Sequence, residues 1–124
     1  MSLVLVVDDD APFRRLACAV LARAGYRTCQ AADGEEALQI LADRPVGLVL
    51  LDMDLPKVSG HGVLDGLATH PLCHGIPVIL MSALEDAEIE KYVRDPRVRA
   101  VLLKTRFSLA DLRAQVRRAL PLAG

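Results

Sequence analysis

Apolar runs typical of strands alternate with helix-like patterns along the whole chain. A continuous apolar run such as Leu3 to Val7 is typical of a strand buried on both faces. Between the runs, apolar residues recur three and four positions apart, which predicts helices with one buried face. The expected strands are Leu3 to Val7, Tyr26 to Ala31, Leu48 to Leu51, Val78 to Met81 and Arg99 to Leu103. This alternation predicts a parallel sheet with helices on both faces.

Local signals mark where the expected helices begin and end. Pro12 suits the first turn of the first helix, and Gly25 suits its end. Asp33 is expected to cap the second helix, and Ser108 with Asp111 comes near a capping box at the start of the last. The other two helices are expected near Val63 to Ala68 and, less amphipathic, from Leu84 to Val93.

The composition describes one soluble domain. The 124 residues suffice for a single core, and we expect the domain to span 1–120, with 121–124 as a tail or the start of a linker. No apolar stretch has the length of a membrane span, and no signal peptide precedes the first strand. The cysteines at 18, 29 and 73 are odd in number and lack metal spacing. We therefore expect reduced thiols in a cytoplasmic protein.

Charge is distributed unevenly, although the formal net charge is only -1. Residues 91–124 carry nine Lys or Arg against two acids, whereas residues 1–90 carry six against fourteen. An acidic N-terminal part and a basic C-terminal part can form separate surfaces that bind separate partners. The basic part has no aromatic interleaving and no recognition motif, so direct binding to nucleic acid is not expected.

Polar side chains follow four of the five expected strands. Asp8 and Asp9 follow the first strand and Asp52 follows the third. Ser82 follows the fourth strand and Lys104 the fifth. In open parallel sheets, ligands bind at the carboxyl ends of the strands. If the first and third strands are neighbours, the three carboxylates converge at that edge.

Such a cluster of carboxylates is destabilised by electrostatic repulsion. Two carboxylates about 4 Å apart repel by about 4 kcal/mol at an effective dielectric near 20. A raised pKa or a bound cation relieves the repulsion, and oxygen ligands suit Mg²⁺. A carboxylate can attack the phosphorus of a phosphoryl group, while a hard cation, a hydroxyl and an ammonium bind its oxygens. Singly, each residue has an ordinary structural role, such as Asp10 as a helix cap, so the combination carries the prediction.

Four segments resemble the receiver domain of bacterial response regulators. They are Val6 to Asp10, Leu51 to Pro56 with Gly60, Met81 to Ala83, and Leu103 to Lys104. The resemblance covers about residues 2 to 120. It implies a flavodoxin-like three-layer α/β sandwich with a five-stranded parallel sheet in the order 2-1-3-4-5 and five helices.

The resemblance also implies a phosphorylation site. Asp52 would accept a phosphoryl group from a phosphohistidine on a sensor histidine kinase or a histidine phosphotransfer protein. Asp8 and Asp9 would hold Mg²⁺, with the carboxylate of Asp52 and the backbone carbonyl of Asp54 completing the site. The chain would then be a signalling switch and not a turnover enzyme.

Two residues would bind the attached phosphoryl group, and a separate face would carry the signal. Ser82 would donate a hydrogen bond to one phosphoryl oxygen, and Lys104 would pair with another. A downstream protein or output domain would read the change, and the family also includes homodimers.

The chain departs from the family in the segments around its last strand. Thr105 follows Lys104 where the family usually has proline, so the loop there is expected to be shifted or strained. Val101 stands where the family often has an aromatic ring that rotates on activation. The segment 94–99, with Pro96, replaces a turn that is usually rich in small residues.

These departures suggest a retained phosphorylation site with a changed output face. That face would include Val101 and a set of arginines that contact an acidic partner, the alternative being a merely solvated basic surface. Charge reversals there should weaken partner binding and leave phosphorylation of Asp52 unchanged. The arginines are Arg94, Arg97, Arg99, Arg113 and Arg117.

Two other functions fit parts of the sequence. Asp52 to Leu55 is similar to the acidic motif of haloacid-dehalogenase-type phosphatases, but those usually carry it on the first strand of a longer chain. A pseudo-receiver, an interaction module with an unused site, is favoured by Val101 and Thr105 and disfavoured by the complete set of strand-end residues.

Overall fold

The fold is a five-stranded parallel sheet in the order β2-β1-β3-β4-β5. The computed structural model describes residues 3–55, 60–69, 75–82, 90, 93–104 and 106–122. The strands are β1 (Leu3–Val7), β2 (Arg27–Ala31), β3 (Leu48–Asp52), β4 (Val78–Ser82) and β5 (Val98–Leu103). This confirms the predicted fold class, strand order and parallel pairing.

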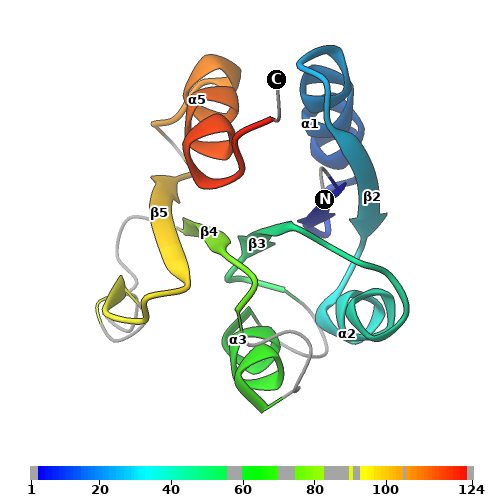
Figure 1. Ribbon diagram of the computed structural model, residues 1–124, viewed down its shortest axis with the longest axis vertical. Helices are drawn as coiled ribbons and strands as arrows, with labels where there is room; N and C mark the ends of the chain where they lie inside the picture. The colour runs from blue at the N-terminus through cyan, green and yellow to red at the C-terminus, as the bar shows by residue number, and fades with distance from the viewer. Residues whose placement is uncertain are drawn as a thin grey trace.

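Helices cover both faces of the sheet. They are α1 (Ala11–Arg23), α2 (Gly34–Asp43), α3 (Gly60–Thr69) and α5 (Leu109–Ala119). Figure 1 shows α1 and α5 on one face and α2 and α3 on the other. The helix expected from Leu84 to Val93 falls almost entirely outside the described residues.

Three helix starts use the side chains that the sequence indicated. Asp10 accepts a hydrogen bond from the backbone N–H of Phe13, and Asp33 accepts one from Glu36. Ser108 forms a full capping box with Asp111, with bonds of 3.1 and 2.9 Å. These bonds satisfy N–H groups that have no partner within their own helix, so they fix where α1, α2 and α5 begin.

The core consists of two apolar layers, one on each side of the sheet. All residues of β1, β3 and β4 are buried, as continuous apolar strands require. Leu51 and Leu80 pack in the layer under α2 and α3, and Leu50 and Ile79 in the layer under α1 and α5. Burying each of these side chains contributes about 2 kcal/mol.

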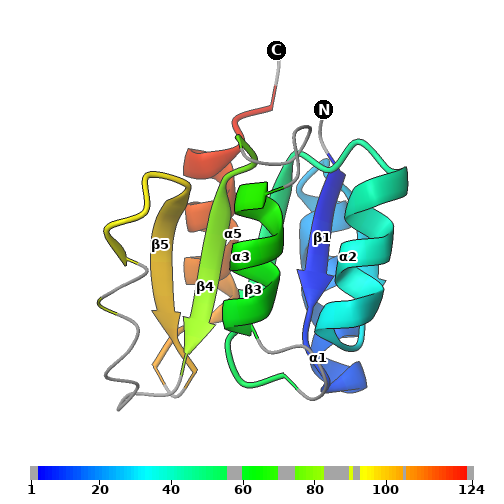
Figure 2. The same ribbon diagram turned by 90° about the horizontal axis from the view of Figure 1, so that it is seen from below.

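All five strands point the same way, so their carboxyl ends share one edge, at the bottom of Figure 2. The described chain ends lie at the opposite edge. Among the described residues, no helix is long and apolar enough to cross a membrane.

Candidate functional site

Asp8 is held in place by the backbone around it. Its N–H donates to the carbonyl of Ala31 at the end of β2 (3.1 Å), and its Oδ1 accepts the N–H of Asp10 (2.8 Å). The guanidinium of Arg14, one turn into α1, donates to the carbonyl oxygen of Asp8 (2.7 Å). The residue is buried, at 6% exposure.

Asp52 is the last residue of β3 and is fully buried. Its Oδ1 accepts the N–H of Asp54 (2.9 Å) and lies 2.6 Å from the Lys104 Nζ. Its Oδ2 is buried and has no hydrogen-bond partner. Unpaired buried carboxylate oxygens are costly, so this atom is poised either to bind a cation or to react.

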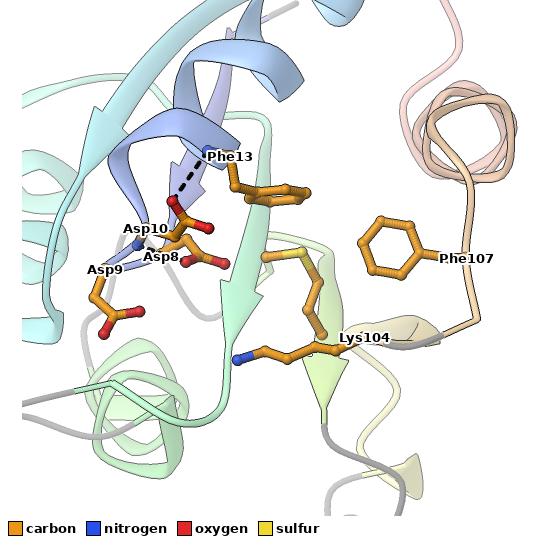
Figure 3. Close-up of a pocket in the computed structure, with 7 residues that line it drawn as sticks. Asp8, Asp9, Asp10, Phe13, Lys104 and Phe107 are labelled. Carbon is orange, nitrogen blue, oxygen red and sulfur yellow. Dashed lines mark hydrogen bonds between the residues drawn. The ribbon is translucent and has the colours of Figure 1, made fainter.

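Lys104 extends from the end of β5 towards the aspartates, as Figure 3 shows. Its N–H donates to the carbonyl of Ser82 (2.9 Å), which fixes the end of β5 against β4. Its Nζ also lies 3.7 Å from the Oδ2 of Asp54. Burial would lower the pKa of the ammonium, but its hydrogen bond to Asp52 and the charges of Asp52, Asp8 and Asp54 outweigh burial and raise the pKa.

Asp8, Asp9 and Asp52 form the predicted acidic cluster. One carboxylate oxygen of each lies within 4.8 Å of the others. Burial raises the pKa of Asp8 to about 6, and the charges of Asp52 and Asp9 add to the rise. The N–H of Asp10 and the charge of Lys104 oppose it. This all-oxygen set, with an unpaired oxygen on Asp52, fits a hard divalent cation such as Mg²⁺.

An open cavity of about 340 Å³ lies over this cluster. Phe13 from α1 and Phe107 from the segment before α5 line it, with ring centroids 6.1 Å apart in an edge-to-face arrangement. Sequence reasoning missed both rings. The signal was available, because the chain has only two phenylalanines and each follows a strand-end residue of the site.

Ser82 is the last residue of β4 and is fully buried at the same edge. The structure therefore brings together all five strand-end residues that the sequence singled out: Asp8, Asp9, Asp52, Ser82 and Lys104. Thr105 lies outside the described residues.

The residues of the expected output face divide into two groups. Arg94, Arg99, Arg113 and Arg117 are exposed. Val101 is half-buried and packs against the layer under α2 and α3.

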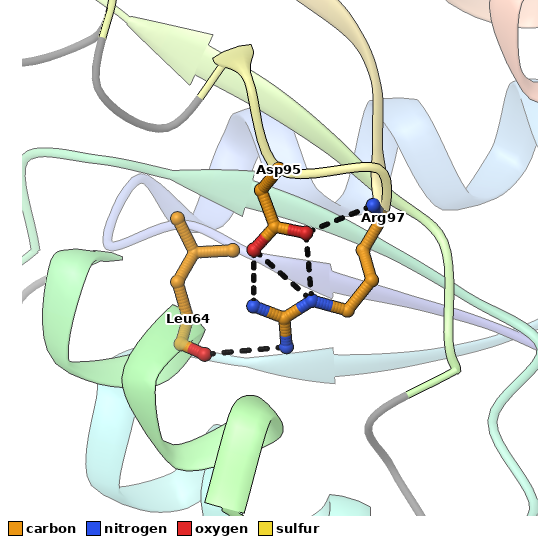
Figure 4. A network of polar contacts seen from close by, with 3 residues as sticks. All are labelled: Leu64, Asp95 and Arg97. Atoms are coloured by element: carbon orange, nitrogen blue, oxygen red, sulfur yellow. Dashed lines mark hydrogen bonds and ion pairs between the residues drawn. The ribbon is translucent and has the colours of Figure 1, made fainter.

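Arg97 lies apart from the exposed arginines. Its side chain is 13% exposed and pairs with Asp95 through several hydrogen bonds and with the carbonyl of Leu64 in α3 (3.4 Å), as Figure 4 shows. Its guanidinium is thus engaged within the molecule and secures the turn before β5 to α3. The sequence could not show this, because Leu64 is far from Arg97 in the chain.

The chain matches the family model described as the response regulator receiver domain over residues 4–117. It is 38% identical over 92 residues to response regulator RR06 of Streptococcus pneumoniae, an alignment covering 74% of this chain and 41% of the relative. It is 33% identical over 119 residues to the phosphate regulon transcriptional regulatory protein PhoB of Pseudomonas aeruginosa, covering 82% and 52%. The chain spans about half or less of the length of the curated relatives it matches.

Solved structures agree with the fold. The receiver domain of the Francisella response regulator 1452 matches with a TM-score of 0.83 and 27% identity, covering 96% of both chains. The chemotaxis response regulator CheY4 of Vibrio cholerae matches with a TM-score of 0.86 over 97% of this chain and 99% of that chain. At 24% identity, the second likeness concerns the fold alone.

Proposed function

This chain belongs to the response regulator receiver domain family, and from that premise we propose that it is a signalling switch phosphorylated on Asp52. The observation that carries the proposal is the environment of Asp52. It is a fully buried carboxylate with one oxygen paired to Lys104 and the other unpaired.

The unpaired Oδ2 of Asp52 is the atom that would attack phosphorus. The donor is a phosphohistidine on a sensor histidine kinase or a histidine phosphotransfer protein. A P–O bond to Asp52 forms, the P–N bond of the donor breaks, and the imidazole leaves with the electron pair of that bond and takes up a proton. Lys104 holds the other carboxylate oxygen, which fixes the orientation of the nucleophile.

The acidic cluster would hold a Mg²⁺ ion during this transfer. Asp8 and Asp9 would ligate it, together with the carboxylate of Asp52 and the backbone carbonyl of Asp54. When bound, the ion supplies positive charge that neutralises the phosphoryl oxygens. In its absence, only Lys104 among the described site residues balances the three carboxylates.

Ser82 and Lys104 are the groups we assign to the attached phosphoryl group. The hydroxyl of Ser82 would donate to one phosphoryl oxygen, and the ammonium of Lys104 would move from the Asp52 carboxylate to another. Both residues end neighbouring strands, and the N–H of Lys104 is bonded to Ser82. A change at one is therefore transmitted to the other and to the start of the segment before α5.

The chain would accept and slowly lose a phosphoryl group and would not turn over a substrate. Its signal would pass to a downstream protein or an attached output domain, with homodimer formation as one route. We propose that it works in the cytoplasm, where cysteines are kept reduced. Cys18 and Cys29, the two cysteines among the described residues, are unbonded.

Phosphorylation is tested by incubation with Mg²⁺ and acetyl phosphate, followed by intact mass spectrometry. We expect an adduct of one phosphoryl group, which EDTA and the substitution Asp52→Asn each remove. Asp54→Asn is the matched control, because it changes a neighbouring carboxylate whose side chain is exposed and should keep the adduct.

The alternatives give different results in the same experiment. A protein that takes no adduct under any condition is a pseudo-receiver, and the proposal fails. Multiple turnovers on a phosphate monoester would indicate a phosphatase instead. An adduct that persists in Asp52→Asn would place the modified residue elsewhere.

A further inference from the structure

The guanidinium of Arg14 joins three elements where β1 ends. Its Nη1 donates to the main-chain carbonyl of Asp8 (2.7 Å), and its Nε donates to the side-chain Oε1 of Gln30 (3.2 Å). Arg14 belongs to α1, Gln30 belongs to β2, and Asp8 directly follows β1. Arg14 is half-buried, whereas its neighbour Arg15 is exposed. One planar cation therefore ties the end of β1 to both α1 and β2.

The carbonyl that Arg14 holds belongs to the peptide between Asp8 and Asp9. Because the peptide unit is planar, a bond to its oxygen also constrains the N–H of Asp9 and the direction in which the chain continues. The N–H of Asp8 donates to the carbonyl of Ala31, and its side chain accepts the N–H of Asp10. The bond from Arg14 adds to this set and constrains how the carboxylates of Asp8 and Asp9 lie relative to each other.

We propose that Arg14 is a positioning residue for the divalent cation, which orients Asp8 and Asp9 for Mg²⁺ without contacting the ion. The inference rests on the proposed function, since it concerns the same acidic cluster. Asp9 is exposed, so the position of its carboxylate depends on its backbone more than on packing. Groups that orient metal ligands from outside the coordination shell typically change metal affinity by about 10–100-fold when they are removed.

Gln30 explains why the residue at position 14 is an arginine. A guanidinium donates in a fixed planar fork, so it can bridge two acceptors in defined directions. Here the Nε is held by Gln30 on the edge strand β2, which keeps the Nη1 directed at Asp8. A lysine ammonium is a single point charge on a flexible stem. Lysine at position 14 would therefore keep the charge and lose the bridge.

Two simpler roles of Arg14 predict different results. If Arg14 only fastens α1 to the sheet, its loss lowers the stability of the metal-free protein and leaves the Mg²⁺ affinity of the folded protein unchanged. If Arg14 acts only through its charge, it repels a cation. Arg14→Gln would then bind Mg²⁺ more tightly, and Arg14→Lys would match the wild-type protein.

The test measures the dissociation constant for Mg²⁺ of the folded, unphosphorylated protein, by titration with MgCl₂ followed in ¹H–¹⁵N NMR spectra. We expect Arg14→Lys to raise this constant by about tenfold. Gln30→Ala should raise it by a smaller factor, because Arg14 keeps its bond to Asp8 and loses its second anchor. Arg15→Lys is the matched control and should leave the constant unchanged, since Arg15 is the next residue of α1 and is exposed.

Phosphorylation by acetyl phosphate gives a second measurement. At a Mg²⁺ concentration below the wild-type dissociation constant, Arg14→Lys should form the Asp52 adduct more slowly by about the factor that its Mg²⁺ affinity loses. Saturating Mg²⁺ should restore most of the rate, because the substitution weakens the binding of the ion and leaves the nucleophile in place. A rate that stays low at saturating Mg²⁺ would overturn a role in cation binding.

The outcomes separate this inference from the proposed function. A wild-type protein that binds no Mg²⁺ and takes no adduct overturns both. A wild-type protein that binds Mg²⁺, with the same dissociation constant in Arg14→Lys, overturns the positioning role alone. Thermal melting in EDTA checks that each variant is folded. If Arg14→Lys unfolds, Gln30→Ala decides, because Gln30 is exposed, and a dissociation constant equal to that of the wild type overturns the proposal.

Discussion

At the scale of single residues, Lys104 is the group on which the charge balance of the site depends. Its ammonium lies 2.6 Å from one oxygen of Asp52 and 3.7 Å from one of Asp54. Asp52 is fully buried, so in the metal-free protein its carboxylate relies on this contact and on the N–H of Asp54. We therefore expect residue 104 to affect stability as well as the proposed phosphorylation.

We predict that Lys104→Met destabilises the metal-free protein by about 1–3 kcal/mol, because it leaves a buried carboxylate without its cation. The partial exposure of Lys104 keeps the loss below that of a fully buried pair. Urea denaturation in EDTA measures the change. Adding Asp52→Asn to Lys104→Met should recover most of the loss, and a double variant no more stable than Lys104→Met would contradict the pairing.

The residue scale also shows what the sequence could and could not predict. Asp8, Asp9, Asp52, Ser82 and Lys104 were predictable, because each follows an apolar run and the fold brings such positions together. Phe13 and Phe107 were not singled out. Their position after strand-end residues was visible in the sequence, but their contact depends on how α1 packs against the segment before α5.

At the scale of elements, the turn before β5 depends on Asp95. Its carboxylate accepts the backbone N–H of Arg97 (2.9 Å) as well as the Arg97 guanidinium, which in turn reaches the carbonyl of Leu64. These hydrogen bonds secure β5 to α3. They lie in the segment 94–99, which replaces the small-residue turn that is usual in the family. The sequence placed Arg97 on the partner surface, because charge alone does not show which arginines find an internal acid.

We predict a pH-dependent contribution from this turn. The hydrogen bonds from Arg97 hold the pKa of Asp95 below its ordinary value of 3.8, so the folded state favours the charged form. The stabilisation is fully present above that ordinary value and is lost as the pH falls through the lower pKa of the folded state. Asp95→Asn should therefore be less stable than the wild-type protein at pH 7 by about 1 kcal/mol or more.

Chemical denaturation of both proteins as a function of pH measures this contribution. The difference between wild type and Asp95→Asn should shrink below about pH 4 and not above it. Ser108→Asn is a suitable control, because asparagine can still cap α5 and the change lies outside this network. A difference that is constant with pH would show that Asp95 acts through its shape and not its charge.

Elements also differ in how well their patterns predicted them. β1, β3 and β4 were evident from continuous apolar runs, and Ser108 and Asp111 located the start of α5. Val78 of β4 pairs with Val98 but Ile79 pairs with Ala100, which leaves Arg99 as an extra residue in β5. This β-bulge was not predictable, because it arises from the register between β4 and β5 and no local pattern encodes it. β5 accordingly begins at Val98, one residue before the expected start.

At the scale of the whole molecule, the acidic cluster joins segments that are far apart in the chain. Asp8 and Asp9 follow β1 and Asp52 ends β3, so a cation bound between them would stabilise the folded chain and would have no equivalent site in the unfolded one. Burial raises the pKa of Asp8, and the charges of Asp52 and Asp9 in the cluster add to the rise.

We predict that Mg²⁺ stabilises the protein by mass action, by about 2.7 kcal/mol at a concentration one hundred times its dissociation constant. Thermal melting with and without EDTA measures it. Asp9→Ala should lose most of the effect, whereas Asp10→Asn should keep it, since asparagine can still cap α1 and Asp10 lies outside the cluster. Equal stabilisation of both variants would indicate non-specific binding.

The last described residues are anchored to the turn between α1 and β2. The buried Tyr26 donates its hydroxyl to the carbonyl of Leu120 (2.6 Å), and the side chain of Leu122 lies over Gly25, a residue with a φ of 102°. Leu3, at the start of β1, lies at this same pole, opposite the Asp52 pocket (Figure 2). Tags or fused domains joined at either terminus would therefore begin on the far side of the molecule and leave the approach of a phosphodonor unobstructed.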